Sequence, residues 1–137
     1  MSGSGVTSDA PTVASLRAAL AGRPDVVIAL LFGSRARGSH RSDSDVDVAV
    51  LGPVDRLALA LALTRVTQRD VHVVDLASAN HVLLSEIVRE GIPVHEGVPG
   101  ALGSWRSHAL TQLDLDRPFV ERMRKAYLAK LASGAHR

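Results

Sequence analysis

Two short apolar segments joined by a polar stretch constrain the fold of this chain more than any other feature. Residues 25–32 (DVVIALLF) form an apolar run that is too short for an ordinary helix and suits a strand covered on both faces. In residues 45–51 (DVDVAVL), Val46, Val48 and Val50 fall on one face of a strand and the two aspartates on the other. We therefore predict a buried central strand and a second strand with a chemically distinct edge.

The other segments alternate between helix and strand patterns. Apolar residues at helical spacing predict a helix over 12–20. Residues 54–67 are also predicted to be helical because Leu and Ala are strong helix formers, although their alternation imitates a strand. Three elements follow: a strand over 70–76, a helix from Ser78 or Asn80 to Gly91, and a short strand over 92–95. This order of elements predicts an α/β fold class.

The 137 residues have room for one ordinary domain. Residues 1–11 are polar and rich in Gly and Ser, so we expect a disordered tail there and the domain over 12–97. Residues 98–137 are predicted to be a helical extension, with a linker through residue 103 and then one or two helices, Pro118 starting the second. An apolar stripe at roughly four-residue spacing marks the second helix: Phe119, Met123, Tyr127 and Leu131.

Composition and charge exclude several classes of protein. The chain has no cysteine, which excludes disulfides and thiolate metal sites, and its start lacks the pattern of a secretory signal. The longest strongly apolar run, 26–32, is far shorter than the roughly 20 residues that span a bilayer. A net charge of +2 is too small to indicate direct DNA binding. We therefore expect a cytoplasmic protein with no membrane segment.

Asp45 and Asp47 are the first candidate site residues. Two carboxylates at positions i and i+2 of a strand project to the same side, with α-carbons about 6.6 Å apart. Their oxygens then converge on Mg²⁺, and a pair of such ions about 4 Å apart supports phosphoryl-transfer chemistry. We predict that Asp45 and Asp47 are catalytic residues and ligands of Mg²⁺.

Gly33, Ser34, Arg37 and Gly38 form a second candidate group, directly after the first strand. A turn that opens a short helix there aims backbone N–H groups and the Ser34 hydroxyl at an anion. Gly33 admits phosphates without a Cβ in the way, and Gly38 lets the turn reverse. Arg37 is placed to neutralise the charge of a transferring or leaving phosphate. We predict that this turn binds a triphosphate that also reaches the metal.

Asp75, near the end of the third predicted strand, is a candidate third carboxylate. If that strand pairs beside the one carrying Asp45 and Asp47, the three carboxylates meet at one edge of the sheet. Asp75 would then be a metal ligand and the general base for an attacking hydroxyl. The alternative is an ordinary aspartate at a strand end or a helix cap.

Other metal sites are less consistent with the sequence. Asp43 shares a face with Asp45 and Asp47 in an extended chain, but it lies in a predicted polar loop, so we prefer the later pair. A calcium loop beginning at Asp43 requires Gly and Glu where this chain has Val48 and Val54. The six histidines form no HExxH pattern and have no cysteine partners, which argues against zinc. Three roles stay open, those of Arg35, His40 and Asp43.

Three motifs in order, GSRARG at 33–38, SDVD at 44–47 and VDL at 74–76, resemble the minimal nucleotidyltransferase family of the DNA polymerase β superfamily. The resemblance covers residues 12–97. It implies a mixed β-sheet with flanking helices. It also implies a triphosphate held by Ser34 and the Gly33 backbone, and Mg²⁺ held by Asp45, Asp47 and Asp75.

Short members of this family resemble antitoxins encoded beside a HEPN-type ribonuclease toxin, which they silence by attaching AMP from ATP to a tyrosine of the toxin. The resemblance implies an adenylyltransferase that binds ATP, Mg²⁺ and a cognate HEPN toxin in a hetero-oligomer. Three of the four aromatic residues lie in the C-terminal extension, which is consistent with a partner contact there and equally with packing of the extension on its own domain. Two alternatives are a nucleotidyltransferase acting on a small molecule of the aminoglycoside type and a non-enzymatic antitoxin acting by occlusion.

Overall fold

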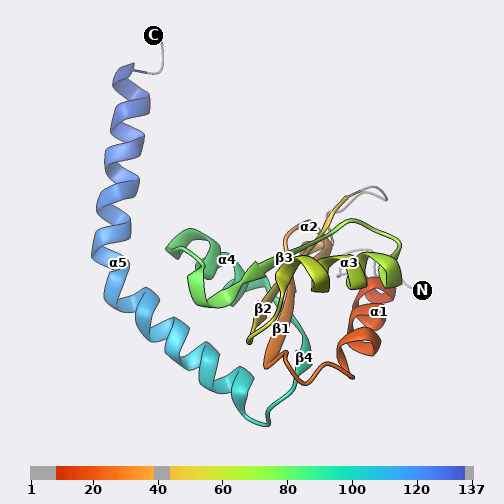
Figure 1. The fold of residues 1–137 in the computed structure, drawn as a ribbon. Coiled ribbons are helices and arrows are strands. Elements are labelled where there is room, and N and C mark those ends of the chain that lie inside the picture. The colour runs from red at the N-terminus through yellow and green to blue at the C-terminus, as the bar shows by residue number, and fades with distance from the viewer. Residues whose placement is uncertain (1–8, 39–43, 135–137) are drawn as a thin grey trace, which may run out of the picture.

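The computed structural model describes residues 9–38 and 44–134 of the chain (Figure 1). The alternation of strands and helices within these ranges confirms the predicted α/β fold class, and α3 shows that the Leu–Ala pattern belongs to a helix. The elements in order are α1 (Ala10–Leu20), β1 (Ile28–Phe32), α2 (Ser34–Arg37), β2 (Val46–Leu51), α3 (Arg56–Thr67), β3 (Val71–Asp75), the 3₁₀ helix η2 (Leu76–Ser78), α4 (His81–Glu90), β4 (Ile92–Glu96) and α5 (Ala101–Gly134).

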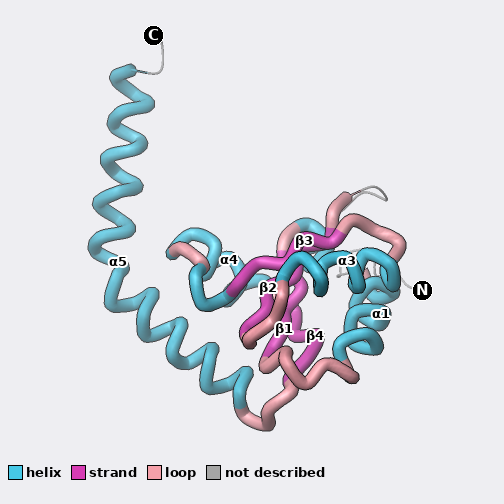
Figure 2. Tube along the Cα trace, viewed as in Figure 1, coloured by secondary structure: helices cyan, strands magenta, loops and turns pink. Residues whose placement is uncertain are grey.

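Within the described ranges, four strands form one mixed sheet in the order β3-β2-β1-β4 (Figure 2). β1 runs antiparallel to both of its neighbours, β2 and β4, whereas β2 and β3 are parallel. All five residues of β1 are buried, because this interior strand has helices over both of its faces. The continuous apolar run over 25–32 therefore correctly predicted a central strand.

Different helices cover the two faces of the sheet (Figure 2). On one face, Val48 of β2 lies in a core with Leu16 of α1 and Leu63 of α3. On the other face, Leu30 of β1 lies in a core with Ile87 of α4, against which the first turns of α5 also pack. Each such buried side chain contributes about 1.5–3 kcal/mol relative to an exposed one. Helices therefore cover both faces of the sheet, and its edges and strand ends are the parts where an active site can form.

The N-terminal boundary of the domain differs from the prediction. Asp9 caps α1: its carboxylate accepts hydrogen bonds from the backbone N–H of Thr12 (3.3 Å) and from the Thr12 hydroxyl (2.5 Å). Pro11 in the first turn supports the same start, since its missing N–H costs nothing there. Residues 9–11 therefore belong to the domain and not to the tail expected over 1–11. Apolar spacing, which begins only at Val13, placed the helix start too late.

The carboxyl group of Asp9 determines part of the response of the fold to acid. Burial raises its pKa, but hydrogen bonds from Thr12 and Arg35 outweigh burial and hold the pKa below its ordinary value of 3.8. The stabilisation is therefore present above the unfolded pKa and is lost as the pH falls through the folded pKa. We expect Asp9→Asn to lose less stability than the parent between about pH 5 and pH 2, measured by urea unfolding. Equal losses in the two proteins would contradict this assignment.

The C-terminal extension differs from the prediction in where it begins and in its continuity. The Leu102 backbone N–H donates to the Glu96 carboxylate (2.9 Å), and α5 begins at Ala101, inside the predicted linker. One helix runs through to Gly134 with Pro118 inside it, so Pro118 does not start a second helix. Figure 1 shows α5 changing direction about halfway and leading away from the sheet, as expected for a helix kinked by an internal proline. In the described part of the chain, no helix is both long enough and apolar enough to cross a bilayer.

Candidate active site

The antiparallel pairing of β1 and β2 brings the predicted phosphate-binding turn beside the predicted metal ligands. Phe32, the last residue of β1, is paired with Asp47 near the start of β2, so Gly33 follows β1 next to the Asp47 carboxylate. Gly33 has φ +80° and ψ −158°, a conformation open almost only to glycine. A Cβ on Gly33 would lie 2.6 Å from Asp47 Oδ2. Two motifs that are separated in sequence thus meet at a point where only glycine fits.

The turn that follows Gly33 is the four-residue helix α2. The Gly33 carbonyl accepts hydrogen bonds from the backbone N–H groups of Ala36 (3.1 Å) and Arg37 (3.1 Å), which leaves the Gly33–Ser34 backbone at the open end of the turn. Gly38 ends the helix in the left-handed conformation, with φ +78°, and its N–H donates to the Ser34 carbonyl. The places of Gly33, Ser34 and Gly38 are those that the sequence predicted.

Asp47 is half-buried, and its surroundings disfavour its charge. Burial raises the pKa of the Asp47 carboxyl, and the nearby carboxylates of Asp45 and Glu86 raise it further, whereas His72 and Arg37 lower it. The net effect is a raised pKa. A half-buried carboxylate crowded by two others is a group that a cation would stabilise.

The two predicted ligands fit a magnesium ion that binds together with a nucleotide. Across residues 9–38 and 44–134, no group of three or more His, Asp or Glu side chains is arranged to hold a metal by itself. Mg²⁺ does not require such a group, because proteins usually bind it through one or two carboxylates, with substrate phosphates and water completing the coordination. Asp47 supplies a carboxylate beside the Gly33 backbone, and Asp45 supplies a second one close enough to Asp47 to raise its pKa.

The register of β2 and β3 does not bring Asp75 to this pair, contrary to our expectation. The two strands are adjacent, but Asp75 lies opposite Val50, three residues and about 10 Å along β2 from Asp47. The Asp75 carboxylate instead accepts hydrogen bonds from the Ala77 backbone N–H (3.0 Å) and the Ser78 hydroxyl (3.3 Å), and so caps η2. Asp75 is therefore a helix-capping aspartate, which was the alternative to a metal ligand that we gave from the sequence.

His72 occupies the place on β3 that a third carboxylate was expected to fill. It is the residue opposite Asp47, and its Nε2 lies 3.0 Å from Asp45 Oδ2. His72 was not among the site residues predicted from the sequence. Residues 46–50 align in parallel with residues 71–75, and this alignment pairs the second residue of each segment, Asp47 with His72. Such an alignment of the two sequences would have indicated the position of His72.

Arg37 connects α2 to α4. Its guanidinium lies 3.4 Å from the Glu86 carboxylate and 3.3 Å from the Glu90 carboxylate, and these two residues are one helical turn apart on α4. All three side chains are partly exposed, so the ion pairs themselves contribute little to stability. Neither Glu86 nor Glu90 was predicted from the sequence, and contact of Arg37 with phosphate stays a prediction. His40 and Asp43, whose roles were open, lie outside the described residues.

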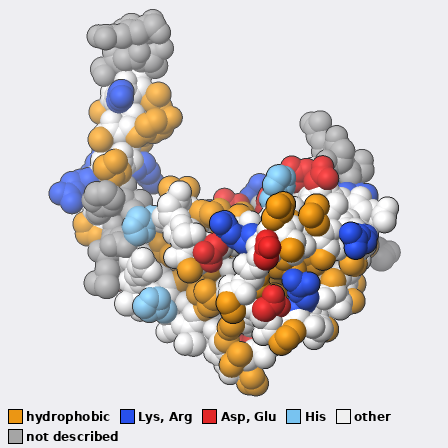
Figure 3. All heavy atoms as spheres, in the orientation of Figure 1, with side chains coloured by type: hydrophobic (Ala, Val, Ile, Leu, Met, Phe, Trp, Pro, Cys, Tyr) orange, Lys and Arg blue, Asp and Glu red, His pale blue; other side chains and the backbone are white. Residues whose placement is uncertain are grey.

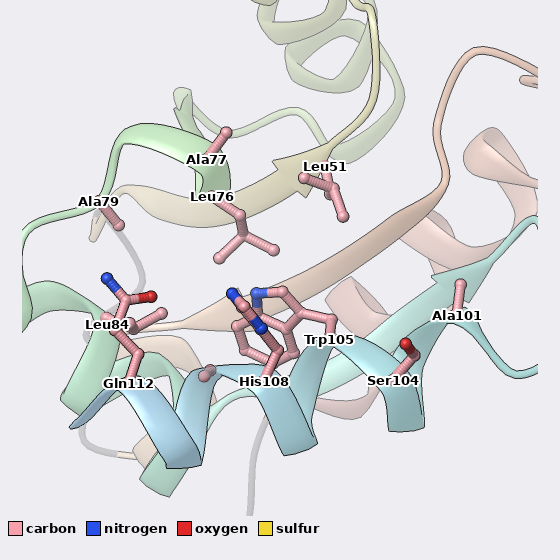
Figure 4. A pocket seen from close by; sticks show the side chains of 11 residues that line it. Leu51, Leu76, Ala77, Ala79, Leu84, Ala101, Ser104, Trp105, His108 and Gln112 are labelled. Carbon is pink, nitrogen blue, oxygen red and sulfur yellow. The ribbon is translucent and has the colours of Figure 1, made fainter. Parts of the chain in front are cut away.

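A partly open pocket of about 510 Å³ lies beside Leu51, at the end of β2 (Figure 4). It lies between the end of β2, η2, α4 and the first turns of α5, and Leu51, Leu76 and Trp105 are among its lining residues. Asp45 and Asp47 lie at the start of β2, whereas Leu51 ends that strand. The pocket is therefore separate from the candidate active site.

The fold and this site are those of a nucleotidyltransferase. The chain belongs to the polymerase beta nucleotidyltransferase family, whose model matches residues 15–97. It is similar to the protein adenylyltransferase MntA of Shewanella oneidensis, with 37% identity over 73 residues that cover 50% of this chain and 52% of MntA. The match thus spans about half the length of that curated relative. The family resemblance predicted from the motifs is confirmed.

Two solved structures resemble this chain over most of its length. A crystal structure of a toxin–antitoxin with AMP-PNP matches with a TM-score of 0.69 and 25% identity, covering 88% of this chain and 98% of that chain. The tri-AMPylated Shewanella oneidensis HEPN toxin in complex with its MNT antitoxin matches with a TM-score of 0.63 and 23% identity, covering 88% and 96%. The second match shows the fold alone. The shared fold therefore extends beyond the sheet into the C-terminal helical region.

Proposed function

We propose that this chain is an antitoxin enzyme that transfers AMP from ATP to the hydroxyl group of a tyrosine on a cognate HEPN-type toxin. This transfer neutralises the toxin. The observation that carries the proposal is the approach of the Gly33 backbone to the Asp47 carboxylate, which a single methyl group would obstruct. Nucleotidyl transfer requires the triphosphate and the metal-binding carboxylates to meet at one point, in fixed geometry.

In the proposed reaction, the oxygen of the acceptor hydroxyl attacks the α-phosphorus of ATP. A new oxygen–phosphorus bond forms, and the bond from the α-phosphorus to the oxygen that bridges it to the β-phosphate breaks. Pyrophosphate leaves with that electron pair, and the hydroxyl proton passes to water. Mg²⁺, when bound with the nucleotide, neutralises phosphate charge. Gly33 and Ser34 bind the phosphates, while Asp45 and Asp47 fix the position of the metal.

The identities of the donor and the acceptor are supported by the relatives. MntA is a protein adenylyltransferase, one matched structure contains AMP-PNP, and another contains an AMPylated HEPN toxin with its antitoxin. These properties extend to this chain only as part of the proposal. A cytoplasmic location and the lack of direct DNA binding stay predictions.

The test is to incubate the chain with labelled ATP, Mg²⁺ and the HEPN-type protein encoded beside its gene, and to measure the intact mass of both proteins. The proposal predicts that the HEPN-type protein gains the mass of one or more AMP groups and loses ribonuclease activity. Stoichiometric inhibition without any mass gain would instead favour occlusion. Transfer only to a small-molecule hydroxyl would favour the aminoglycoside-type alternative.

We further propose that the toxin contacts the second half of α5, the part of the helix that follows Pro118. Large apolar side chains are exposed there, with Met123 57% and Tyr127 62% exposed. The space-filling view shows apolar and basic side chains along this arm and a hollow between the arm and the body (Figure 3). The basic residues of this half are Arg122, Arg124, Lys125 and Lys130, against the single acidic Glu121. The complementary partner surface is apolar and bordered by acidic side chains.

Charged residues in this apolar stripe should weaken partner binding specifically. We expect Met123→Glu with Tyr127→Glu to raise the Kd for the HEPN-type protein about 100-fold, measured by calorimetry, since buried interface anchors carry most of the affinity. The matched control is Leu57→Glu with Leu61→Glu, which alters two exposed leucines at the same spacing on α3. The control should bind within about twofold of the parent. Equal effects of the two double variants would refute a contact through α5.

A further inference from the structure

Arg35 is a charged residue in the interior of the domain, with only 2% of its surface exposed. Its guanidinium donates to the Asp9 carboxylate (2.6 Å) and to the backbone carbonyl of Ser44 (2.7 Å). The backbone adds a further link, because the Asp9 N–H donates to the Arg35 carbonyl (3.2 Å). Burying a charge is costly unless it is paired and hydrogen-bonded, and Asp9 and Ser44 meet this requirement.

The contacts of Arg35 connect the two halves of the candidate active site. Arg35 follows Ser34 in α2, and Ser44 immediately precedes Asp45. The hydrogen bond from Arg35 to Ser44 therefore joins the phosphate-binding turn directly to the start of the carboxylate strand. A guanidinium presents its donors in a rigid, planar arrangement. Two hydrogen bonds from one guanidinium therefore attract both acceptors and also fix the distance between them.

We propose that Arg35 is a positioning residue, which holds the phosphate-binding turn of α2 at a fixed distance from Asp45 through Ser44, with Asp9 as its counter-ion. This inference rests on the proposed function for the role of the two groups that it connects. A nucleotide that contacts both the turn and the metal ligands is sensitive to their separation, and a misplacement of about 1 Å costs about 100-fold in rate. Residues at the start of α1 thus support the active site without touching the nucleotide.

The test compares Arg35→Lys with the parent. Lysine keeps the positive charge beside Asp9 but lacks the fork that also reaches Ser44. At a temperature where both proteins are folded, we expect the Kd for Mg²⁺ with AMP-PNP to rise about 10-fold and kcat/KM for AMP transfer to fall about 100-fold. Hydrogen exchange without nucleotide should also become faster at the backbone amides of 45–47.

Two matched controls separate positioning from general stability. Arg17 also donates to a backbone carbonyl, that of Pro93 (3.2 Å), but away from the site, so Arg17→Lys should leave the Kd within about twofold. Asp9 and Asp55 are both helix caps, and Asp9 differs from Asp55 in its ion pair with Arg35. Asp9→Asn, which retains a capping side chain, should therefore raise the Kd, whereas Asp55→Asn should not.

The outcomes distinguish failure of this inference from failure of the proposed function. A folded Arg35→Lys protein with the nucleotide affinity and amide exchange of the parent would overturn the positioning role. A parent that binds AMP-PNP but modifies no HEPN-type protein would overturn the acceptor assignment, while the nucleotide affinities still decide the role of Arg35. If Arg35→Lys does not fold, an unchanged nucleotide affinity of Asp9→Asn would overturn the inference instead.

Discussion

Asp47→Asn is expected to abolish AMP transfer while making the nucleotide-free chain more stable. The loss of transfer, about 1,000-fold or more, follows because the amide cannot replace a negatively charged metal ligand. The gain in stability follows from the raised pKa of Asp47. For a carboxyl whose folded pKa lies above its unfolded value of 3.8, the folding cost is absent below that value and grows as the pH rises through the folded pKa. At neutral pH the charge opposes folding, and asparagine removes this cost.

Thermal unfolding with and without ligand tests both effects of Asp47→Asn. At pH 7 we expect the Tm of the variant to exceed that of the parent, and the difference to shrink as the pH falls toward 4. Mg²⁺ with AMP-PNP should raise the Tm of the parent but not that of the variant. Asp25→Asn is the control, because Asp25 forms a partly exposed pairing with Arg23 (3.6 Å) that contributes little to stability. A variant that is less stable than the parent, or still transfers AMP, would contradict the assignment of Asp47.

Periodicity along the sequence predicted which face each strand residue occupies. The alternation of 45–51 placed Val46, Val48 and Val50 in the core and Asp47 on the opposite face, as observed. The distance by which one strand is shifted along its neighbour depends also on the segment that joins the two strands, and the prediction of Asp75 considered only that β3 lies beside β2. For that reason the sequence brought β3 beside β2 correctly but placed Asp75, instead of His72, next to the aspartate pair.

The residues that sequence reasoning missed act through side chains that meet only in the folded chain. Arg35 lies 26 residues from Asp9, and Arg37 lies 49 residues from Glu86, so no local pattern marks either pair. Local chemistry also outweighed composition at helix ends. The Glu96 carboxylate accepts a hydrogen bond from the Leu102 N–H and so supports the start of α5. This start lies in a segment whose glycines and proline predicted a linker. The positions of Gly33 and Gly38 in the turn were predictable from the sequence because each reflects one local requirement, a backbone conformation that favours glycine.

Gly33→Ala is expected to lower both stability and AMP transfer, because this position combines backbone strain with a close approach. At φ +80° and ψ −158°, a residue with a Cβ costs about 1–3 kcal/mol. The added methyl group would also lie 2.6 Å from Asp47 Oδ2, so the carboxylate or the turn must move. We expect kcat/KM to fall about 100-fold in addition to the loss of stability, since the turn and the metal ligand no longer meet as required.

Gly22→Ala provides the matched control for this substitution. Gly22 lies in the turn between α1 and β1, and a Cβ there would meet no atom within 4 Å. We expect this control to keep the kcat/KM of the parent within about twofold and to change the Tm little. If Gly33→Ala lowers the Tm but binds Mg²⁺ with AMP-PNP and transfers AMP like the parent, the approach to Asp47 serves the fold alone. If both activity and nucleotide binding fall at temperatures where the variant is folded, the contact between the turn and Asp47 is a requirement of the chemistry.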